Sequence, residues 1–495
     1  MSSPTALYSV EQVRALDAYA IDTLGIASYT LMKRAAEAAL RTLRSRWPTA
    51  LKITVVTGGG NNGGDGYALA RFGQAAGLAV SVLAVVRPER LKGDALRACE
   101  DFRASGGPIL PFTAGLLQQA EVVVDAVCGT GLTTELRGDT AAAVEAINRC
   151  QRPVLALDLP SGLNGDTGAL LGTAVRADCT ISFVALKTGL FLGAGPEHAG
   201  RVLLDDLEVV PPPLPAFEPQ LERLGEAEIA RALPRRLRGA NKGDFGRVLL
   251  IGGGAGMAGA VRMAGEACLR VGAGRVTVAS APENLAAITT ERPELICLGA
   301  DSVAKIESAL ASTDVVAVGP GLGMTPWARS LLDAALVSGK PLVLDADALN
   351  LLAQGDAVVP PNAILTPHPG EAARLLQCTS AAVQADRLRA LRSLAARHPG
   401  IVVLKGAGTL IGAHGRTAAI CERGNPGMAA PGMGDVLTGA IAGILAQCRD
   451  PWAAARVGVL VHALAGDELA RDRGERGLLA LDVAAGLTRW INLRS

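Results

Sequence analysis

Clusters of glycine follow several short apolar runs in this chain. The chain has 495 residues, of which 59 are Gly, and hydrophobic residues make up 49% of it. Such an apolar chain, only 19% charged, has the composition of a folded protein. Its glycines therefore belong to ordered turns, where the backbone needs room. The densest cluster is Gly58–Gly66 (GGGNNGGDG), which comes directly after the apolar run Ile53–Thr57.

Short apolar runs alternate with helical stretches along the whole chain. Continuous runs of this kind, separated by helices, are typical of parallel strands covered on both faces. In the N-terminal half the expected strands are Ile53–Thr57, Ala79–Val86, Glu121–Ala126, Val154–Asp158 and Thr180–Val184. The same alternation returns between Arg247 and Leu404. We therefore predict α/β architecture with two doubly wound, three-layer domains.

A proline-rich segment divides the chain. Val209–Gln220 (VVPPPLPAFEPQ) forms neither a helix nor a central strand, because proline lacks the backbone N–H that both require. We expect domains at residues 1–210 and 221–495, joined by a linker at 211–220. Both are ordinary domain sizes.

Charge and aromatic content exclude several classes of function. Lys and Arg total 48 against 47 Asp and Glu, and aromatic residues make up only 3%. This balance argues against a protein that wraps nucleic acid or stacks single-stranded bases. Met1–Val10 does not resemble a signal peptide, and the apolar stretch Val436–Ala446 is too short to span a bilayer. The scattered cysteines fit a reduced compartment. We expect a cytoplasmic protein without nucleic-acid or membrane partners.

Polar residues follow the apolar runs of the N-terminal half. Asn62 and Ser161 each come shortly after a predicted strand, and Asp125 lies at the carboxyl end of one. Since ligands of open α/β sheets bind at the carboxyl ends of the strands, these side chains can meet there. Oxygen ligands of low total charge suit a monovalent cation. The alternative for Asp125 is that it caps a turn. The alternatives for Gly58–Gly66 are a tight structural turn and a phosphate-binding loop.

The last glycine cluster of the C-terminal half precedes an apolar helix. Its backbone N–H groups and the helix dipole favour a phosphate group, although Asp435 lies directly beside them. An acid at that place can accept the proton of a hydroxyl group that receives a phosphoryl group, or it is a plain N-cap. His368 lies between two prolines and either contacts a substrate or makes a structural hydrogen bond. Lys405 either neutralises phosphate charge or is a solvated tip.

These segments together resemble a known family. GGGNNGGDG, VDAVCGTG and DLPSGLNGDTG resemble the NAD(P)HX epimerase domain, which has a Rossmann-like fold. NKGDFGRVLLIGG, GPGLG, DADALN, TPHPGE, KGAGT and NPGMAAPGMGDVLTG resemble the ADP-dependent NAD(P)HX dehydratase, which has a ribokinase-like fold. Their order along the chain resembles that of the bifunctional bacterial NAD(P)H-hydrate repair enzymes.

The resemblance implies a metabolite-repair activity. NADH and NADPH that are hydrated at the nicotinamide ring form R and S hydrates, NADHX and NADPHX. The epimerase interconverts the two forms, and the dehydratase uses ADP to return the S form to NADH or NADPH, with release of AMP and phosphate. The resemblance also implies K⁺ in the epimerase domain and Mg²⁺ with ADP in the dehydratase domain. We further expect a homo-oligomer.

The resemblance also assigns residues to each site. In the epimerase domain the hydrate would contact Asn61, Asn62, Gly63, Gly64, Asp65, Gly129, Thr130, Gly131, Leu132, Thr133, Thr134, Glu135 and Asp158. Potassium would be held by Asn62, Asp125 and Ser161. In the dehydratase domain the hydrate would contact Ala260, Gly323, His368 and Asp435. The adenine nucleotide would contact Lys405, Gly406, Ala407, Gly408, Thr409 and Gly434.

Two catalytic carboxylates are expected. Asp435 would be the base of dehydration, and Asp158 would handle or orient the proton in epimerisation. One departure from the family pattern, A-T-G-G-x-G-D, lies beside the first of them: this chain reads AAPGMGD over Ala429–Asp435. Because Pro431 removes one backbone donor, we expect a shifted or weaker anion hole.

Three other functions stay open at the level of sequence. One is a ribokinase-like small-molecule kinase fused to a dinucleotide-binding module. Another is an NAD(P)-dependent oxidoreductase, although the strand after Gly58–Gly66 ends at Arg87 rather than at the usual acid. The third is a nucleotide sensor without catalysis.

Overall fold

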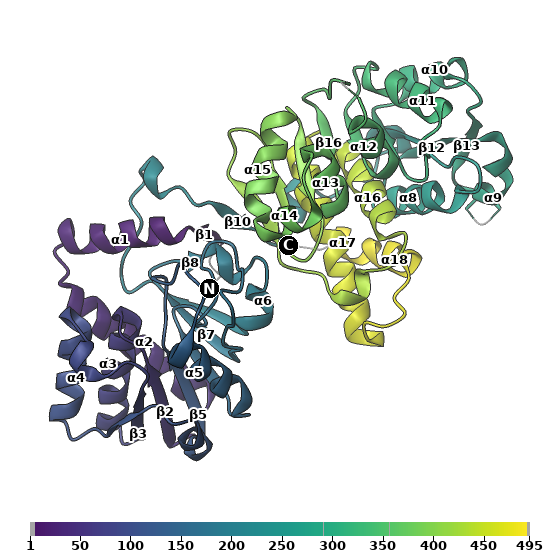
Figure 1. The fold of residues 1–495 in the computed structure, drawn as a ribbon. Helices are drawn as coiled ribbons and strands as arrows, with labels where there is room; N and C mark the ends of the chain where they lie inside the picture. Colours follow the sequence, from purple (N-terminus) through teal and green to yellow (C-terminus); the bar gives the residue numbers. More distant parts are fainter. Residues whose placement is uncertain (1–4, 291, 356, 493–495) are drawn as a thin grey trace. The chain divides into compact units, whose positions relative to one another are not determined.

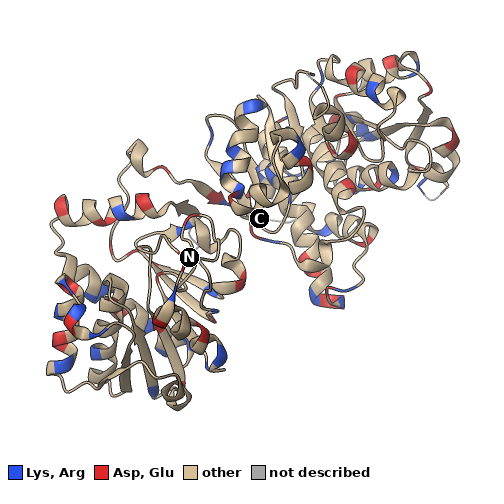
Figure 2. Cartoon of the chain, in the orientation of Figure 1, with Lys and Arg blue, Asp and Glu red and all other residues tan. Residues whose placement is uncertain are grey.

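The chain divides into two compact units, Met1–Leu221 and Glu222–Ser495 (Figure 1). The structure, a computed structural model, describes residues 5–290, 292–355 and 357–492. Around the boundary, the proline-rich segment contains one 3-10 turn, η4 (Pro215–Phe217), followed by the short strand β10 (Leu221–Arg223). Positive and negative residues are interspersed along the elements of both units (Figure 2).

The first unit is built on a parallel sheet with the strand order β4-β3-β2-β5-β6-β7-β9. Its strands are β2 (Lys52–Thr57), β3 (Ala79–Ala84), β4 (Ile109–Pro111), β5 (Val122–Ala126), β6 (Val154–Leu157), β7 (Cys179–Phe183) and β9 (Arg201–Asp205). In the centre, Val55 of β2 lies opposite Val82 of β3 and Val124 of β5. Every residue of β5 and β6 is buried, because helices cover both faces.

One apolar core lies on each face of this sheet. The larger core contains residues of α1 to α4, and the other contains residues of α5 and of the turn η2 (Ala114–Gln119). The helices are α1 (Val10–Asp22), α2 (Ser28–Arg46), α3 (Asn61–Ala75), α4 (Gly93–Ala104), α5 (Gly138–Arg149) and the short α6 (Gly195–His198). Two short strands, β1 (Ala6–Tyr8) and β8 (Leu186–Lys187), pair in parallel outside the main sheet.

The second unit also contains a mostly parallel sheet, in the order β13-β12-β11-β14-β15-β16-β17-β18-β19. Its strands are β11 (Arg247–Ile251), β12 (Arg275–Ser280), β13 (Ile296–Gly299), β14 (Val315–Val318), β15 (Leu342–Leu344), β16 (Ala363–Leu365), β17 (Ile401–Leu404), β18 (Thr409–Gly412) and β19 (Ala418–Cys421). The pairs are parallel up to β17, and β17, β18 and β19 then pair antiparallel. The predicted doubly wound α/β class is thus confirmed for both units.

The helix α16 (Met433–Cys448) lies in the core of the second unit, beside α8 (Ala258–Arg270) and α17 (Pro451–Arg473). The other helices are α7 (Ala227–Ala232), α9 (Leu285–Thr289), α10 (Val303–Ser312), α11 (Pro326–Leu336), α12 (Ala346–Leu352), α13 (Pro369–Leu376), α14 (Ser380–Ala385), α15 (Arg387–Arg397) and α18 (Ala480–Ile491). Residues Val436–Ala446 of α16 are buried throughout by protein. Within the described ranges, every helix is too short or too polar to cross a membrane.

Candidate functional sites

The first unit has a cavity of about 670 Å³ at the carboxyl ends of β2, β5 and β6. Of the residues that the resemblance assigned to the hydrate, the cavity is lined by Asn61, Asn62, Asp65, Gly129, Thr130, Gly131, Leu132 and Asp158. The others, Gly63, Gly64, Thr133, Thr134 and Glu135, are not among its lining residues. Residues of the glycine cluster and of the loop after β5 thus line the same cavity.

Two glycines of the first cluster are required by packing. A Cβ atom on Gly58 would lie 1.9 Å from the carbonyl oxygen of Val127, and one on Gly63 would lie 2.3 Å from the carbonyl oxygen of Gly58. The helix α3 begins at Asn61, with Gly60 as an N-cap that offers no side chain. The backbone N–H groups of its first turn are therefore not capped by a side chain, and they lie beside the cavity.

The predicted cation ligands lie at the base of this region. The Ser161 hydroxyl donates to Asp125 Oδ1 over 2.6 Å, and the Ser161 N–H donates to Asp125 Oδ2 over 2.8 Å. Both residues are completely buried. Burial raises the pKa of Asp125 to about 6, although the hydrogen bonds from Ser161 lower it.

The side-chain amide of Asn62 belongs to the same region. Both polar atoms of its amide are buried and have no partner within the described part of the chain. Its side chain packs against Gly129, where a Cβ atom would lie 3.2 Å from Asn62 Cβ. A buried amide without hydrogen bonds costs about 1–3 kcal/mol, so a bound group is expected to pair with it. A carboxylate, a hydroxyl and an amide oxygen together fit a monovalent cation.

Asp158 is held by a lysine that sequence reasoning did not single out. Its carboxylate forms an ion pair with Lys187 Nζ and accepts a hydrogen bond of 3.2 Å from the Phe183 N–H. The backbone of Asp158 has a φ of 67°, in the left-handed region that non-glycine residues rarely adopt. The side chain of Lys187 is 1% exposed. The available sequence signal was a lysine within the otherwise apolar run SFVALK.

Two further carboxylates line the same cavity. Burial and the Asp158 charge raise the pKa of Asp17, on α1, to about 6, although Lys187 lowers it. Burial, followed by the charges of Asp158 and Asp17, also raises the pKa of Asp65, on α3, well above its ordinary value. Sequence reasoning missed Asp17, because it lies beside the buried face of an ordinary amphipathic helix.

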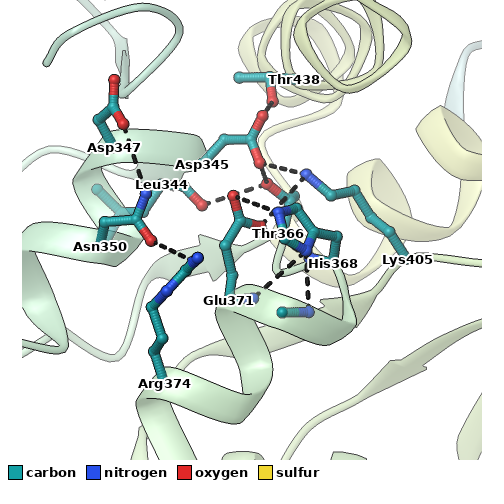
Figure 3. Close-up of polar contacts among 11 residues, drawn as sticks. Leu344, Asp345, Asp347, Asn350, Thr366, His368, Glu371, Arg374, Lys405 and Thr438 are labelled. Atoms are coloured by element: carbon teal, nitrogen blue, oxygen red, sulfur yellow. Dashed lines mark hydrogen bonds and ion pairs between the residues drawn. The ribbon is translucent and has the colours of Figure 1, made fainter. Parts of the chain in front are cut away.

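In the second unit, charged residues meet at the carboxyl ends of β15, β16 and β17 (Figure 3). Asp345 Oδ1 lies 2.5 Å from Lys405 Nζ and accepts a 2.8 Å hydrogen bond from the Thr366 hydroxyl. Asp345 Oδ2 accepts a 2.7 Å hydrogen bond from Thr438 of α16. Burial lowers the pKa of Lys405, but Asp345 and Glu371 outweigh it, so that the pKa is raised. The alternative that Lys405 is a solvated tip is therefore wrong.

His368 makes structural hydrogen bonds through one ring nitrogen. Its Nδ1 accepts from the N–H groups of Gly370 and Glu371 over 2.9 and 3.3 Å, while Glu371 Oε2 accepts from the His368 N–H over 2.8 Å. This capping box begins α13. Burial raises the pKa of Glu371 to about 7, although Lys405 lowers it. Burial, followed by the charge of Lys405, lowers the pKa of His368.

Asp435 lies in the first turn of α16, and the N-cap of this helix is Gly432. The alternative that Asp435 is a plain N-cap is therefore wrong. Burial and the charge of Asp345 raise its pKa to about 7, although Lys405 lowers it. Pro431 precedes the N-cap, so the first-turn N–H groups of α16 do not include the donor that proline lacks.

The other assigned residues of this unit belong to several elements. The Gly323 N–H donates to Asp347 Oδ2 over 2.7 Å, and Ala260 lies in the first turn of α8. A Cβ atom on Gly434 would lie 3.4 Å from Lys405 Nζ. Gly406, Ala407 and Gly408 form the turn between β17 and β18, and Thr409 begins β18. The buried Arg387 donates to the carbonyl oxygens of Leu404, Lys405 and Gly408, which fixes this turn.

Comparison with known proteins assigns a family to each unit. A family model described as "YjeF-related protein N-terminus" matches residues 28–189, and one described as "NAD(P)H-hydrate dehydratase" matches residues 248–489. A solved ribokinase-like superfamily protein from Enterococcus faecalis is 30% identical, with a TM-score of 0.51, over 55% of this chain and 95% of its own. The predicted ribokinase-like fold of the second unit is thereby confirmed.

Two curated relatives match both units at once. A bifunctional NAD(P)H-hydrate repair enzyme from Coxiella burnetii is 45% identical over 99% of this chain and 100% of its own. One from Escherichia coli is 41% identical over 99% of this chain and 95% of its own. This chain therefore belongs to the family of bifunctional NAD(P)H-hydrate repair enzymes.

Proposed function

We propose that the chain repairs hydrated NADH and NADPH with one active site in each unit. The first unit epimerises the R and S hydrates, and the second uses ADP to dehydrate the S form. The observation that carries this proposal is the match to bifunctional relatives over nearly the full length of both chains, with each unit containing its own cluster of buried acids. If the chain were a ribokinase-like kinase fused to a binding module, the buried acids of the first unit would have no catalytic function.

In the second unit, the hydroxyl group of the hydrate gives its proton to Asp435. Its oxygen attacks the β-phosphorus of ADP, and the bond from that phosphorus to the bridging oxygen breaks, which releases AMP. The electron pair of the ring nitrogen then expels phosphate, and loss of a proton from the neighbouring ring carbon restores the double bond. Support for Asp435 as the base comes from its raised pKa of about 7 and its position in the first turn of α16.

Nucleotide binding in this mechanism uses the turn after β17 and the start of α16. The N–H groups of Gly406, Gly408 and Gly434 would contact the nucleotide, with Lys405 beside them. Mg²⁺ bound with ADP would offset the phosphate charge, and the carboxylates of Glu371 and Asp435 are hard oxygen donors of the kind it prefers. Ala260, Gly323 and His368 would contact the hydrate.

In the first unit, the hydrate would occupy the 670 Å³ cavity, beside Asp158. Asn62, Asp125 and Ser161 would hold K⁺, which would supply positive charge beside the Asp125 carboxylate. The unpaired amide of Asn62 supports this assignment. Homo-oligomerisation and a cytoplasmic location stay predictions, and light scattering of the purified protein tests the first.

The test is a recovery assay on mixed NADHX epimers with K⁺, with and without ADP, followed by the absorbance of NADH. We expect full recovery when ADP is present, because epimerisation feeds the S form to the dehydratase. Recovery that stops at the S fraction would contradict epimerisation by the first unit. An ATP-dependent phosphorylated product from another small molecule, with no action on NADHX, would favour the kinase.

A further inference from the structure

Four ionisable side chains from four different elements line the cavity of the first unit. Asp17 comes from α1, Asp65 from α3, Asp158 follows β6, and Lys187 belongs to β8. One ammonium group thus lies among three carboxyl groups. Two other charged residues line the cavity, and each pairs with a neighbour that also lines it: Arg14 donates to the Thr130 carbonyl oxygen, and Asp94 accepts from Ser28.

Lys187 has no N–H group left for a substrate. An ammonium group has three donors, and here they are directed to Asp158, to Ser182 Oγ at 3.1 Å and to the Phe183 carbonyl oxygen at 2.8 Å. The side chain is also almost completely buried. Lys187 can therefore affect a reaction only through the carboxylate that it contacts.

The contacts of Asp158 fix its carboxylate in one orientation. Lys187 and the Phe183 N–H both bind Asp158 Oδ1. A non-glycine residue in the left-handed region costs about 1–3 kcal/mol, and such residues persist where their surroundings hold them. The φ of 67° at Asp158 and that of 65° at Val184 occur on two segments that both line the cavity. The backbone strain therefore lies at the site itself.

Asp65 differs from Asp158 in its environment. Asp158 has a cation as a partner, whereas the charges of Asp158 and Asp17 act against ionisation of Asp65, and burial adds to them. Burial and these two charges therefore favour the protonated form of Asp65, while Asp158 is ion-paired with Lys187. One cavity thus places a carboxyl group that favours its protonated form beside an ion-paired carboxylate, and acid–base catalysis requires these two forms.

We propose that Asp65 is the acid and Asp158 the base of epimerisation, and that Lys187 positions Asp158 for this step. The proposal rests on the function proposed above for the first unit. The bond between the ring carbon and the hydroxyl oxygen breaks, the oxygen takes the Asp65 proton and leaves as water, and the ring nitrogen forms a double bond to that carbon. Water then adds to the opposite face and gives its proton to Asp158. No oxidant or reductant is needed, and the reverse direction exchanges the two roles.

The test measures conversion of the purified R hydrate to the S hydrate by the full-length chain in K⁺ without ADP. Lys187→Met should lower kcat about 100-fold, the size of a general-base contribution, and leave KM within about threefold, because Lys187 has no donor free for the hydrate. Asp65→Asn should also lower kcat at least about 100-fold. In the unmodified protein the rate should fall at high pH as Asp65 loses its proton, and this fall should be absent in Asp65→Asn.

The matched control is Asp205→Asn, which removes a carboxylate of the same unit that pairs with Arg41 outside the cavity. Its rate should equal that of the unmodified protein. If Lys187→Met retains more than a third of kcat, or if the loss appears in KM alone, the positioning role is wrong. If Asp65→Asn keeps the full rate, or if its rate still falls at high pH, the assignment of Asp65 as the acid is wrong. The ion pair between Asp158 and Lys187 is intact in this variant.

Failure of the proposed function and failure of the proposed residue roles give different results. An unmodified protein that does not convert the R hydrate above the uncatalysed rate contradicts epimerisation itself. Conversion by the unmodified protein and by both variants alike contradicts only the roles of Asp65 and Lys187. Thermal unfolding of each variant shows whether it is folded. If Lys187→Met is not folded, the double variant Lys187→Met/Asp158→Asn removes both charges of the ion pair, and it should be folded but inactive.

Discussion

At the scale of single residues, both sites contain an aspartate paired with a lysine beside acids whose pKa is raised. In the second unit, Asp345 pairs with Lys405 while Asp435 and Glu371 have pKa values of about 7. Burial penalises the charged form of each acid, and a neighbouring ionised carboxylate adds to this penalty. Lys405 lowers the pKa of Asp435 and of Glu371, but not enough to cancel these two effects. Asp435 and Glu371 therefore titrate near neutral pH, where proton transfer is most effective.

Asp435→Asn should lower ADP-dependent recovery of NADH about 100- to 10,000-fold, because the amide cannot accept the hydroxyl proton. Epimerisation should be unchanged, since that site lies in the other unit. The measurement is absorbance recovery from S-NADHX with ADP, and R-to-S conversion without ADP is the control. Dehydration at a normal rate would contradict the role of Asp435.

The rate of dehydration should depend on the ionisation of Asp435. Because its raised pKa is about 7 and the base must be ionised, the rate at saturating ADP should fall as the pH drops below about 7. Asp347 contributes to this raised pKa. Asp347→Asn should therefore move the profile slightly to lower pH, because Asp347 is the smallest of these contributions. A move to higher pH would contradict Asp435 as the titrating group.

At the scale of secondary-structure elements, each site lies beside a helix whose N-cap is a glycine. Gly60 is the N-cap of α3, and Gly432, with a φ of 88°, is the N-cap of α16. Neither supplies a side chain, so the first-turn N–H groups stay open to ligands at the positive end of the helix dipole. Packing against α8 fixes the start of α16, since a Cβ atom on Gly432 would lie 2.5 Å from Met263 Sδ.

Two glycines of the first loop make a matched pair for testing this packing. Gly58→Ala should destabilise the first unit by at least about 1–3 kcal/mol, because the new methyl group would overlap the Val127 carbonyl oxygen. Gly60→Ala should cost less than about 1 kcal/mol, since nothing lies within 4 Å of its Cβ position. The urea concentration that halves epimerase activity measures both effects. Equal midpoints for the two variants would contradict this account.

At the scale of the whole molecule, two doubly wound units each carry their own site, and each site lies at the carboxyl ends of its own strands. The topology explains the location, since loops at that edge come from strands distant in sequence. The site residues of each unit have their charged partners within that unit. Conditions that affect only one site should therefore leave the other activity unchanged.

Replacing K⁺ by tetramethylammonium should test this independence. Epimerisation should fall at least about tenfold, equivalent to about 1.4 kcal/mol, because Asp125 and the Asn62 amide would lose the cation that we propose they bind. Dehydration of purified S-NADHX should not change. The stimulation by K⁺ should weaken below about pH 6, where Asp125 takes up a proton in place of the cation. Equal loss of both activities would contradict a site confined to the first unit.

Local patterns in the sequence determined the architecture and part of each site. Alternating apolar runs and helices predicted both sheets, and residues at the carboxyl ends of strands, such as Asp125 and Asp158, indicated the edge where ligands bind. These inferences succeed because strand burial and the position of a strand end are properties of a few consecutive residues. The sequence pattern predicts a helix over Asp65–Ala76, whereas α3 begins at Asn61. The glycines before Asp65 have little helix preference of their own and are placed by packing.

Only the tertiary structure decided which charges meet. Lys405 and Asp345 are 60 residues apart, and Lys187 and Asp158 are 29 apart, so no local spacing predicts either pair. Asp17 enters the cavity from a helix whose pattern is that of any surface helix. The protonation of these acids depends on burial and on the sum of neighbouring charges. The sequence alone therefore determined where the two sites lie, and the packing of distant segments decided which of their acids have a raised pKa.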